Sequence, residues 1–331
     1  MSLQGPIRIA VDIGGTFTDI QVLHEPSART FAFKTPTTPD DPSRGLMEGV
    51  RGAARRHGFE LGQVGVLMHG TTIATNAVLE HKLPPGALVT TAGFRDVLEI
   101  GRHLRQRIYS AIAEPRRLLI ERSRRFEVSE RVDADGRVCV PLDEAELHGI
   151  AQRIEASGAR TVAVCLLHAY ANPEHERMVG RFLREHLGHG FVSLSHELSP
   201  EIREFERSST VAINALLMPV VKSYLDALRA RMQAEGFAPR LYLVQSNGGV
   251  TSPQLAAEQP ARLLLSGPSG GARAAQVLGE ALAEPDLVAV DMGGTSFDVS
   301  LIHDGRMRLV SEGAVDGCPV RLPMIEIRTI G

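Results

Sequence analysis

Short apolar runs alternate with stretches of helical periodicity along most of the chain. The runs have the length of buried strands, and glycine, proline or polar residues bound them. Strands are expected at residues 64–68, 87–91, 161–167, 191–195 and 241–245. Helices are expected at residues 43–57, 73–80, 143–156, 173–186 and 266–282. This alternation predicts an α/β protein in which helices flank the sheet.

Two stretches depart from the alternation. Residues 94–142 are richer in arginine and glutamate and have poorer periodicity, which we interpret as an α+β segment inserted on the core domain. Residues 204–234 carry apolar side chains at helical spacing, interrupted by Pro219. That pattern predicts either two consecutive helices or one kinked helix.

One strand–turn–strand pattern is spelled twice. Its copies span residues 12–19 and 291–298, and both read Asp-x-Gly-Gly-Thr-x-x-Asp. Apolar runs lead into the copies and strand-like runs leave them, at residues 7–11, 20–23, 287–290 and 299–302. Each copy therefore predicts a β-hairpin with a polar tip.

Such a tip suits a phosphate group. Adjacent glycines lack Cβ atoms and let backbone N–H groups approach an anion closely, while threonine adds a hydroxyl donor. The aspartates that flank each tip suit a divalent cation. Two facing hairpins would clamp the phosphates of a nucleotide, although either copy alone is also compatible with an ordinary hairpin turn.

Other strand ends carry weaker signals. Residues 266–271, Ser-Gly-Pro-Ser-Gly-Gly, suit an anion-binding helix start and equally suit close packing of a helix on the sheet. His69 follows a strand, where a lone histidine is more often a hydrogen-bonded structural residue than a catalyst. Its neighbours Thr71 and Thr72 are also candidate helix N-caps.

Composition excludes several classes of protein. The chain has 331 residues, which suggests about two domains, and its formal net charge of −3 recruits neither nucleic acid nor an anionic membrane. No apolar stretch is expected to approach the length of a membrane span, and the N-terminus lacks a signal-peptide pattern. Three scattered cysteines fit reduced thiols and a cytoplasmic location. None of the three lysines follows a glycine, which excludes a P-loop.

The repeated hairpin resembles the two phosphate motifs of the actin, Hsp70 and sugar-kinase ATPase superfamily. Further motifs make the chain similar to the hydantoinase A/5-oxoprolinase family, which includes the N-methylhydantoinase (hydantoin utilisation A) proteins. These motifs lie at residues 69–77, 91–102, 129–133, 195–204, 245–250 and 265–271. The resemblance implies an actin-like ATPase (ribonuclease H-like) fold. It implies an N-terminal family region at residues 7–190 and the start of the hydantoinase A domain at 191–331.

The resemblance also implies ATP-dependent hydrolysis of a cyclic amide such as a hydantoin or 5-oxoproline, with ATP and Mg²⁺ as cofactors. A B-type subunit is the implied partner, and it stays open whether the chain also forms a homo-oligomer. Asp12 and Asp291 would hold Mg²⁺ and act in catalysis, with His69 as a further catalytic candidate. The implied nucleotide contacts are Gly14, Gly15, Thr16, Thr18, Asp19, Gly267, Gly270, Gly271, Gly293, Gly294, Thr295, Ser296 and Asp298.

Two departures from the family pattern matter. Phe297 stands where a threonine is expected, which replaces a hydroxyl donor with a bulky ring. Family members also continue beyond Gly331, so we expect a truncated chain with an incomplete second lobe and little ATPase activity alone. Two alternatives to the cyclic amidase stay open: the ATP-using subunit of an acetone or other ketone carboxylase, and a non-catalytic nucleotide-binding module.

Overall fold

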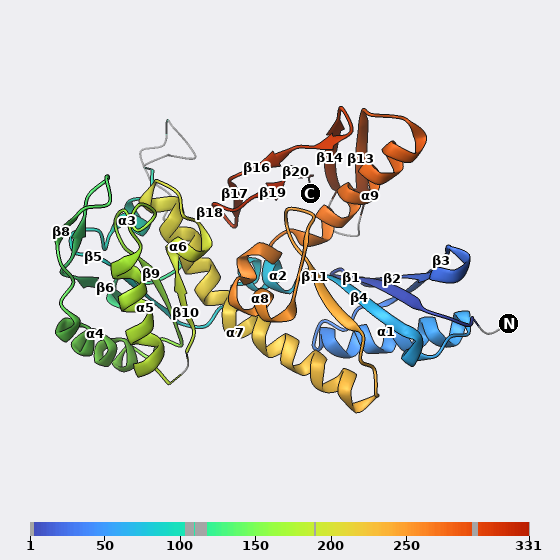
Figure 1. The fold of residues 1–331 in the computed structure, drawn as a ribbon, viewed down its shortest axis with the longest axis horizontal. Coiled ribbons are helices and arrows are strands. Elements are labelled where there is room, and N and C mark those ends of the chain that lie inside the picture. Colours follow the sequence, from blue (N-terminus) through green and yellow to red (C-terminus); the bar gives the residue numbers. More distant parts are fainter. Residues whose placement is uncertain (1–2, 103–108, 110–117, 189, 293–296, 331) are drawn as a thin grey trace. The chain divides into compact units, whose positions relative to one another are not determined.

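The computed structural model describes residues 3–102, 109, 118–188, 190–292 and 297–330. The chain divides into two compact units (Figure 1). Unit 1 comprises residues 1–80, 220–311 and 323–331, and unit 2 comprises residues 81–219 and 312–322. The boundary at residue 219 falls within helix α7 (Glu204–Ala234).

Unit 1 is built on a mixed six-stranded sheet, ordered β12-β11-β4-β1-β2-β3. Strands β1, β4 and β11 run parallel, whereas β1–β2–β3 form an antiparallel meander and β12 pairs antiparallel with β11. The strands are β1 (Ile7–Ile13), β2 (Phe17–His24), β3 (Arg29–Pro36), β4 (Val64–Thr71), β11 (Arg240–Val244) and β12 (Val250–Thr251). Because β1, β4 and β11 are parallel, their carboxyl ends meet at one edge of the sheet.

Helices cover this sheet because apolar side chains alternate along its strands. Strand β1 buries Ile7, Ile9, Val11 and Ile13, while the residues between them are more exposed. Helix α1 packs on the meander and begins at the N-cap Asp41, whose side chain accepts a hydrogen bond from the Arg44 N–H. The helices of unit 1 that lie outside α7 are α1 (Pro42–His57), α2 (Ile73–Leu79), α8 (Pro253–Glu258) and α9 (Ser266–Leu282).

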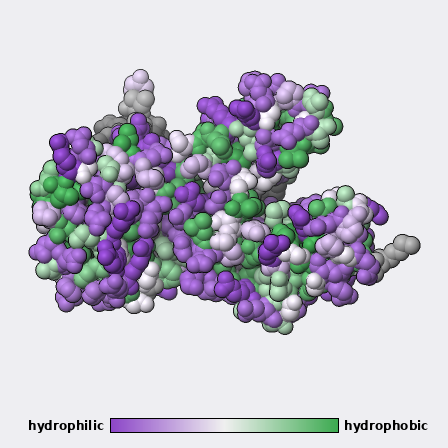
Figure 2. Space-filling view, viewed as in Figure 1, coloured by the Kyte–Doolittle hydropathy of each residue, from purple (hydrophilic) through white to green (hydrophobic). Residues whose placement is uncertain are grey.

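The second copy of the repeated motif forms its own sheet in unit 1. Strand β13 pairs antiparallel with β14, which also pairs with β15 and β20, and α9 packs against the hairpin. These strands are β13 (Leu287–Met292), β14 (Phe297–His303), β15 (Arg306–Met307) and β20 (Ile327–Ile330), and the short pair β16 (Leu309–Val310) and β19 (Met324–Ile325) follows them. Strand β13 exposes the apolar side chains of Val288, Val290 and Met292. Figure 2 shows that hydrophobic residues interrupt the hydrophilic surface in several places.

Unit 2 has a fully parallel four-stranded sheet, ordered β10-β9-β5-β6. It holds the strands β5 (Gly86–Thr91), β6 (Arg125–Val128), β9 (Thr161–Cys165) and β10 (Val192–Leu194), with the short pairs β7 (Arg131–Val132)–β8 (Val138–Val140) and β17 (Gly313–Val315)–β18 (Cys318–Val320). Its helices besides α7 are α3 (Val97–Ile100), α4 (Glu144–Ala156), α5 (Glu174–His186) and α6 (Ser195–Leu198). Strand β6 lies within the stretch interpreted from its sequence as an insertion, and it extends this sheet beside β5.

Helix α7 is a single helix of 31 residues with Pro219 inside it, rather than two separate helices. By length and composition alone it is able to cross a membrane, a test that no stretch was expected to meet. However, 67% of its most apolar window is buried inside the protein. Burial of this extent is that of a core helix.

Two glycines of unit 2 provide a matched test of helix packing. A Cβ added at Gly180 in α5 would lie 2.6 Å from Leu194 Cδ1, whereas a Cβ added at Gly149 in α4 would meet no atom within 4 Å. Gly180→Ala should therefore lower the free energy of unfolding by about 1–3 kcal/mol through overpacking. Gly149→Ala should raise it by about 0.5–1 kcal/mol, because alanine loses less backbone entropy. Urea unfolding of both variants checks the opposite signs.

Candidate active site

The first repeated hairpin places Asp12 at the sheet edge where the parallel strands end. Asp12 pairs with Asp19 across the β1–β2 hairpin and with Gly70 on the parallel strand β4. A Cβ added at Gly70 would lie only 2.8 Å from Asp12 Oδ1. A Cβ at Gly267, in the first turn of α9, would lie 3.6 Å from the same oxygen. The Asp12 carboxyl therefore lies between β4 and the start of α9, an arrangement that needs glycine at residue 70.

The charge state of Asp12 reflects this crowding. Its side chain keeps contact with solvent, yet protein atoms surround the carboxyl densely, and this desolvation raises its pKa above the ordinary value of 3.8. The nearby carboxylates of Asp19 and Asp291 raise the pKa further. Asp12 and Asp291, the first residues of the two repeated motifs, both belong to unit 1, and the charge of Asp291 contributes to the raised pKa of Asp12.

The tip of the first hairpin presents its predicted phosphate contacts to solvent. Gly15 and Thr16 are exposed, and the Gly14 N–H donates to the Phe17 carbonyl across the turn at 3.0 Å. Asp19 lies 3.1 Å from Lys34 Nζ, so its charge is partly neutralised by that ammonium. The exposed glycines and threonine are free of the tight packing that holds Asp12.

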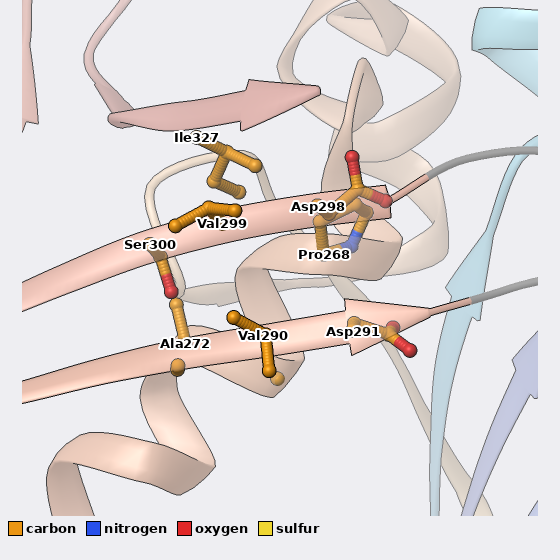
Figure 3. A pocket seen from close by; sticks show the side chains of 10 residues that line it. Pro268, Ala272, Val290, Asp291, Asp298, Val299, Ser300 and Ile327 are labelled. Atoms are coloured by element: carbon orange, nitrogen blue, oxygen red, sulfur yellow. The ribbon is translucent and has the colours of Figure 1, made fainter. Parts of the chain in front are cut away.

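The second hairpin borders a hollow of about 190 Å³ (Figure 3). Asp291 and Asp298 lie directly opposite each other on β13 and β14. Pro268 and Gly271, from the first turns of α9, line the other side. Strands β13, β14 and β20 contribute Ala289, Val290, Asp291, Asp298, Val299, Ser300 and Ile327. The predicted contacts Gly293, Gly294, Thr295 and Ser296 lie outside the described residues.

Serine hydroxyls in the first turn of α9 donate hydrogen bonds to neighbouring backbone carbonyls and hold the start of the helix in place. Ser266 Oγ donates to the Thr71 carbonyl at 3.1 Å, and the buried Ser269 Oγ donates to the Gln245 carbonyl at 2.9 Å. These bonds tie the helix to the ends of β4 and β11. Gly270, by contrast, is exposed, with no atom within 4 Å of an added Cβ. The serines thus pack the helix against the sheet, and the helix start lies beside Asp12 and the hollow; its role in anion binding stays a prediction.

Thr18 and Phe297 occupy equivalent positions on the faces of the hairpins opposite to the aspartates. Thr18 pairs with Ile13, and Phe297 pairs with Met292, one residue from the aspartate pairs in both cases. Successive residues of a strand point to opposite faces. Thr18 is buried, and its hydroxyl shares a 3.2 Å hydrogen bond with Thr37 Oγ1. In the first hairpin the residue equivalent to Phe297 is thus Thr18, whose side chain faces inward. The threonine expected in place of Phe297 would likewise lie on the face opposite to Asp291 and Asp298.

His69 is a buried structural residue, the more common of the two roles considered for it. Its Nε2 lies 2.6 Å from the Tyr224 hydroxyl, and its Nδ1 lies 3.5 Å from the Val11 carbonyl. The carbonyl can only accept, so Nδ1 carries the proton and Nε2 accepts from tyrosine. Burial lowers the pKa of His69 to about 4 and raises that of Tyr224. The structure therefore shows a buried, hydrogen-bonded imidazole and no contact that supports the catalytic role suggested for His69.

His69 should make stability depend on pH. The unfolded histidine binds a proton near pH 6.5 and the folded one only near about 4, so stability is complete above pH 6.5 and falls as the pH drops through this window. The expected loss is about 3 kcal/mol at 1.36 kcal/mol per pKa unit. His69→Gln should flatten this slope in urea unfolding measured from pH 7 to 4. His81→Gln, at an exposed position, should retain it.

The aspartates of the hairpins fit Mg²⁺ held together with phosphate. Mg²⁺ is usually bound by one or two carboxylates plus substrate phosphates and water. The mutual repulsion that raises the pKa of Asp12 is the kind that a cation relieves. Among the described residues, the group of three close ligand atoms lies elsewhere, at the exposed residues Asp286, His303 and Asp304. The hairpins thus suit a nucleotide-bound cation rather than a cage made of protein ligands alone.

Two protein-family models match the chain. The hydantoinase/oxoprolinase N-terminal region matches residues 8–187, and the hydantoinase/oxoprolinase model matches residues 207–331. The chain belongs to the hydantoinase/oxoprolinase family. The resemblance inferred from the motifs is confirmed.

Relatives of the chain include a caprolactamase subunit and a 5-oxoprolinase. The chain is 31% identical, over 98% of its length, to caprolactamase subunit alpha of Pseudomonas jessenii. It is 32% identical, over 99% of its length, to 5-oxoprolinase of Saccharomyces cerevisiae. It covers 47% of the first relative and 28% of the second, and so spans half or less of their length.

Solved structures give the fold. The ATP-dependent caprolactamase from Pseudomonas jessenii matches with a TM-score of 0.88 and 30% identity, over 98% of this chain and 48% of that one. Nucleotide-free acetone carboxylase matches with a TM-score of 0.85 and 26% identity, with the same coverage. These neighbours have an actin-like ATPase fold, so the predicted fold class is confirmed.

Proposed function

We propose that the protein uses ATP to open a cyclic amide, as the A-type subunit of a hydantoinase- or 5-oxoprolinase-like enzyme. The observation that carries the proposal is the pair of matching hairpins at the start of α9, where Asp12 lies beside Gly267 and Asp291 lines a hollow with Pro268 and Gly271. Caprolactamase and 5-oxoprolinase, similar over nearly the whole chain, give the substrate class.

The proposed chemistry has three bond-making steps. The amide oxygen of the ring attacks the γ-phosphorus of ATP, the bond to the β,γ-bridging oxygen breaks, and ADP leaves. Water then attacks the activated ring carbon and the C–N bond opens, with a proton passing to the nitrogen, which leaves an acyl phosphate. A second water attacks the carbonyl carbon of this acyl phosphate, and inorganic phosphate departs with the former amide oxygen to leave the carboxylate. Phosphorylation makes the ring carbon a better electrophile because the oxygen leaves as phosphate.

The residues of this chain position and neutralise charge rather than form covalent bonds. The tip residues Gly15 and Thr16 donate hydrogen bonds to phosphate oxygens, Gly14 shapes the turn through its bond to the Phe17 carbonyl, and the start of α9 offers its free N–H groups. Asp12 and Asp291 hold Mg²⁺. When bound, that ion neutralises charge on the phosphates. The hollow beside Asp291 and Asp298 receives part of the nucleotide.

A second candidate is the ATP-using subunit of a ketone carboxylase, which the similarity to acetone carboxylase favours. A non-catalytic nucleotide-binding module is the third. Its support came from Phe297, whose place on the face opposite to Asp291 and Asp298 removes that reason. The proposal includes a B-type partner subunit, and the name of the caprolactamase relative, a subunit alpha, supports an enzyme with more than one kind of subunit.

Phosphate release by the whole protein with its B-type partner separates the three candidates. Release that depends on 5-oxoproline, a hydantoin or caprolactam supports the cyclic amidase. Release that depends on a ketone plus bicarbonate supports the carboxylase. Nucleotide binding without stimulated turnover by any of these compounds would leave only the binding module. A B-type or a carboxylase reading frame beside the gene gives an independent indication.

A further inference from the structure

The motif that starts at His69 lies between the two elements assigned to phosphate binding, the first hairpin and the start of α9. The proposed function assigns no role to most of its residues. Strand β4 contributes its last residues and α2 its first turn, so that residues 69–76 turn sharply at the sheet edge. His69 faces Tyr224 in the core, and Gly70 makes room for Asp12. Thr72 and Thr75, which follow in the motif, each form a hydrogen bond with the backbone of one of these two elements or of the residue beside it.

Thr72 holds the end of the first hairpin strand. Its Oγ1 donates to the carbonyl of Ile13 at 3.2 Å, directly before Gly14 of the tip. Thr72 Oγ1 also accepts a 3.2 Å hydrogen bond from Asn76 Nδ2, one turn further along α2. Thr72 occupies the N-cap position of α2 without a side-chain capping bond, so its hydroxyl serves the hairpin instead of its own helix.

Thr75 holds the residue that precedes α9. Its Oγ1 accepts a 3.0 Å hydrogen bond from the backbone N–H of Leu265. Leu265 has φ 57° and ψ 28°, a left-handed conformation that L residues other than glycine, asparagine and aspartate seldom adopt. This turn aims the start of α9, with Gly267, at Asp12. Without the hydroxyl, the N–H would lose its partner in a half-buried place.

We propose that residues 69–76 form a positioning element that sets the first hairpin and the start of α9 at a fixed separation, through Thr72 and Thr75. The proposal rests on the proposed nucleotide site, but the threonines touch backbone of the chain and not the nucleotide. Both hydrogen bonds come from threonines three residues apart in one short segment, so the two phosphate-binding elements share a single support. Errors in placing either one would weaken the charge stabilisation that the site offers.

The test is Thr75→Val in the whole protein, compared with Thr75→Ser, which restores the hydroxyl. Thr75→Val should weaken binding of a non-hydrolysable ATP analogue about tenfold, measured by calorimetry, because an N–H loses its acceptor. It should also speed hydrogen exchange in peptides that cover residues 265–271, without nucleotide. Thr75→Ser should restore both values. Thr30→Val, at an exposed position of β3, is the matched control and should change neither.

The two measurements keep this proposal apart from the proposed function. If the wild type binds no nucleotide, the proposed function fails, while the exchange of residues 265–271 still decides whether Thr75 holds the turn. If the wild type binds nucleotide but Thr75→Val matches it in affinity and in exchange, the positioning role is overturned. Should the valine variant not fold, Thr75→Ala takes its place, with the same expectations.

Discussion

Replacing Asp12 by asparagine should abolish ATP turnover while leaving the fold intact or more stable. Asp12 lies against Gly70 of β4 and near Gly267 of α9, where it would hold the cation beside the transferred phosphate. Loss of this charge should lower kcat by about 100-fold or more, as for other groups that stabilise a developing charge. Phosphate release by the whole protein measures the effect.

Although Asp12→Asn should lose turnover, its stability should stay the same or increase. The pKa of Asp12 is raised in the folded state, so the charged carboxylate disfavours folding. The wild type therefore keeps its full stability below the ordinary aspartate pKa of 3.8 and loses some of it as the pH rises above that value. Asp12→Asn should lack this loss and melt at the same temperature or higher at pH 7.

An exposed carboxylate serves as the control. Asp40 forms an ion pair with Arg44 at 2.9 Å, on the surface before α1. Exposed pairs of this kind contribute little to stability, so Asp40→Asn should change neither turnover nor the melting temperature noticeably. Turnover of Asp12→Asn within about threefold of the wild type would contradict the assigned role of Asp12.

The repeated hairpins were predictable from the sequence because they depend on local rules. Period-two alternation, adjacent glycines and flanking aspartates lie within eight residues of each other, and the structure pairs Asp12 with Asp19 and Asp291 with Asp298. The same alternation places Phe297 beside Asp298 and so on the other face of the hairpin. Helix α1 followed equally local signals at Asp41 and Pro42.

What the sequence left open depends on contacts between distant residues. The role of His69 was set by Tyr224, 155 residues further along, and no local pattern announces such a partner. Gly70 was passed over, although a glycine inside a strand pattern often marks the close approach of another group. Thr75 was passed over too, because its acceptor role depends on Leu265, 190 residues away. Tertiary contacts turn ordinary threonines and glycines into parts of a site.

Gly70→Ala should damage the site without damaging the fold. The added Cβ would lie 2.8 Å from Asp12 Oδ1, closer than any stable contact allows, and the neighbour that must give way is the end of a flexible side chain. Rotation of the Asp12 carboxyl relieves the clash at little cost in stability, but it moves the carboxylate away from its place beside Gly267. A displacement of this kind should cost roughly 100-fold in turnover.

Gly65→Ala on the same strand β4 is the matched control for this variant. Its added Cβ would meet no atom within 4 Å, so the backbone effect of replacing glycine by alanine is retained without the clash. Gly65→Ala should keep the turnover of the wild type, and both variants should unfold within about 1 kcal/mol of it in urea. Equal turnover in the two alanine variants would show that the close approach of β4 does not position Asp12. A loss of turnover confined to Gly70→Ala ties activity to the place of one carboxylate, independently of its charge.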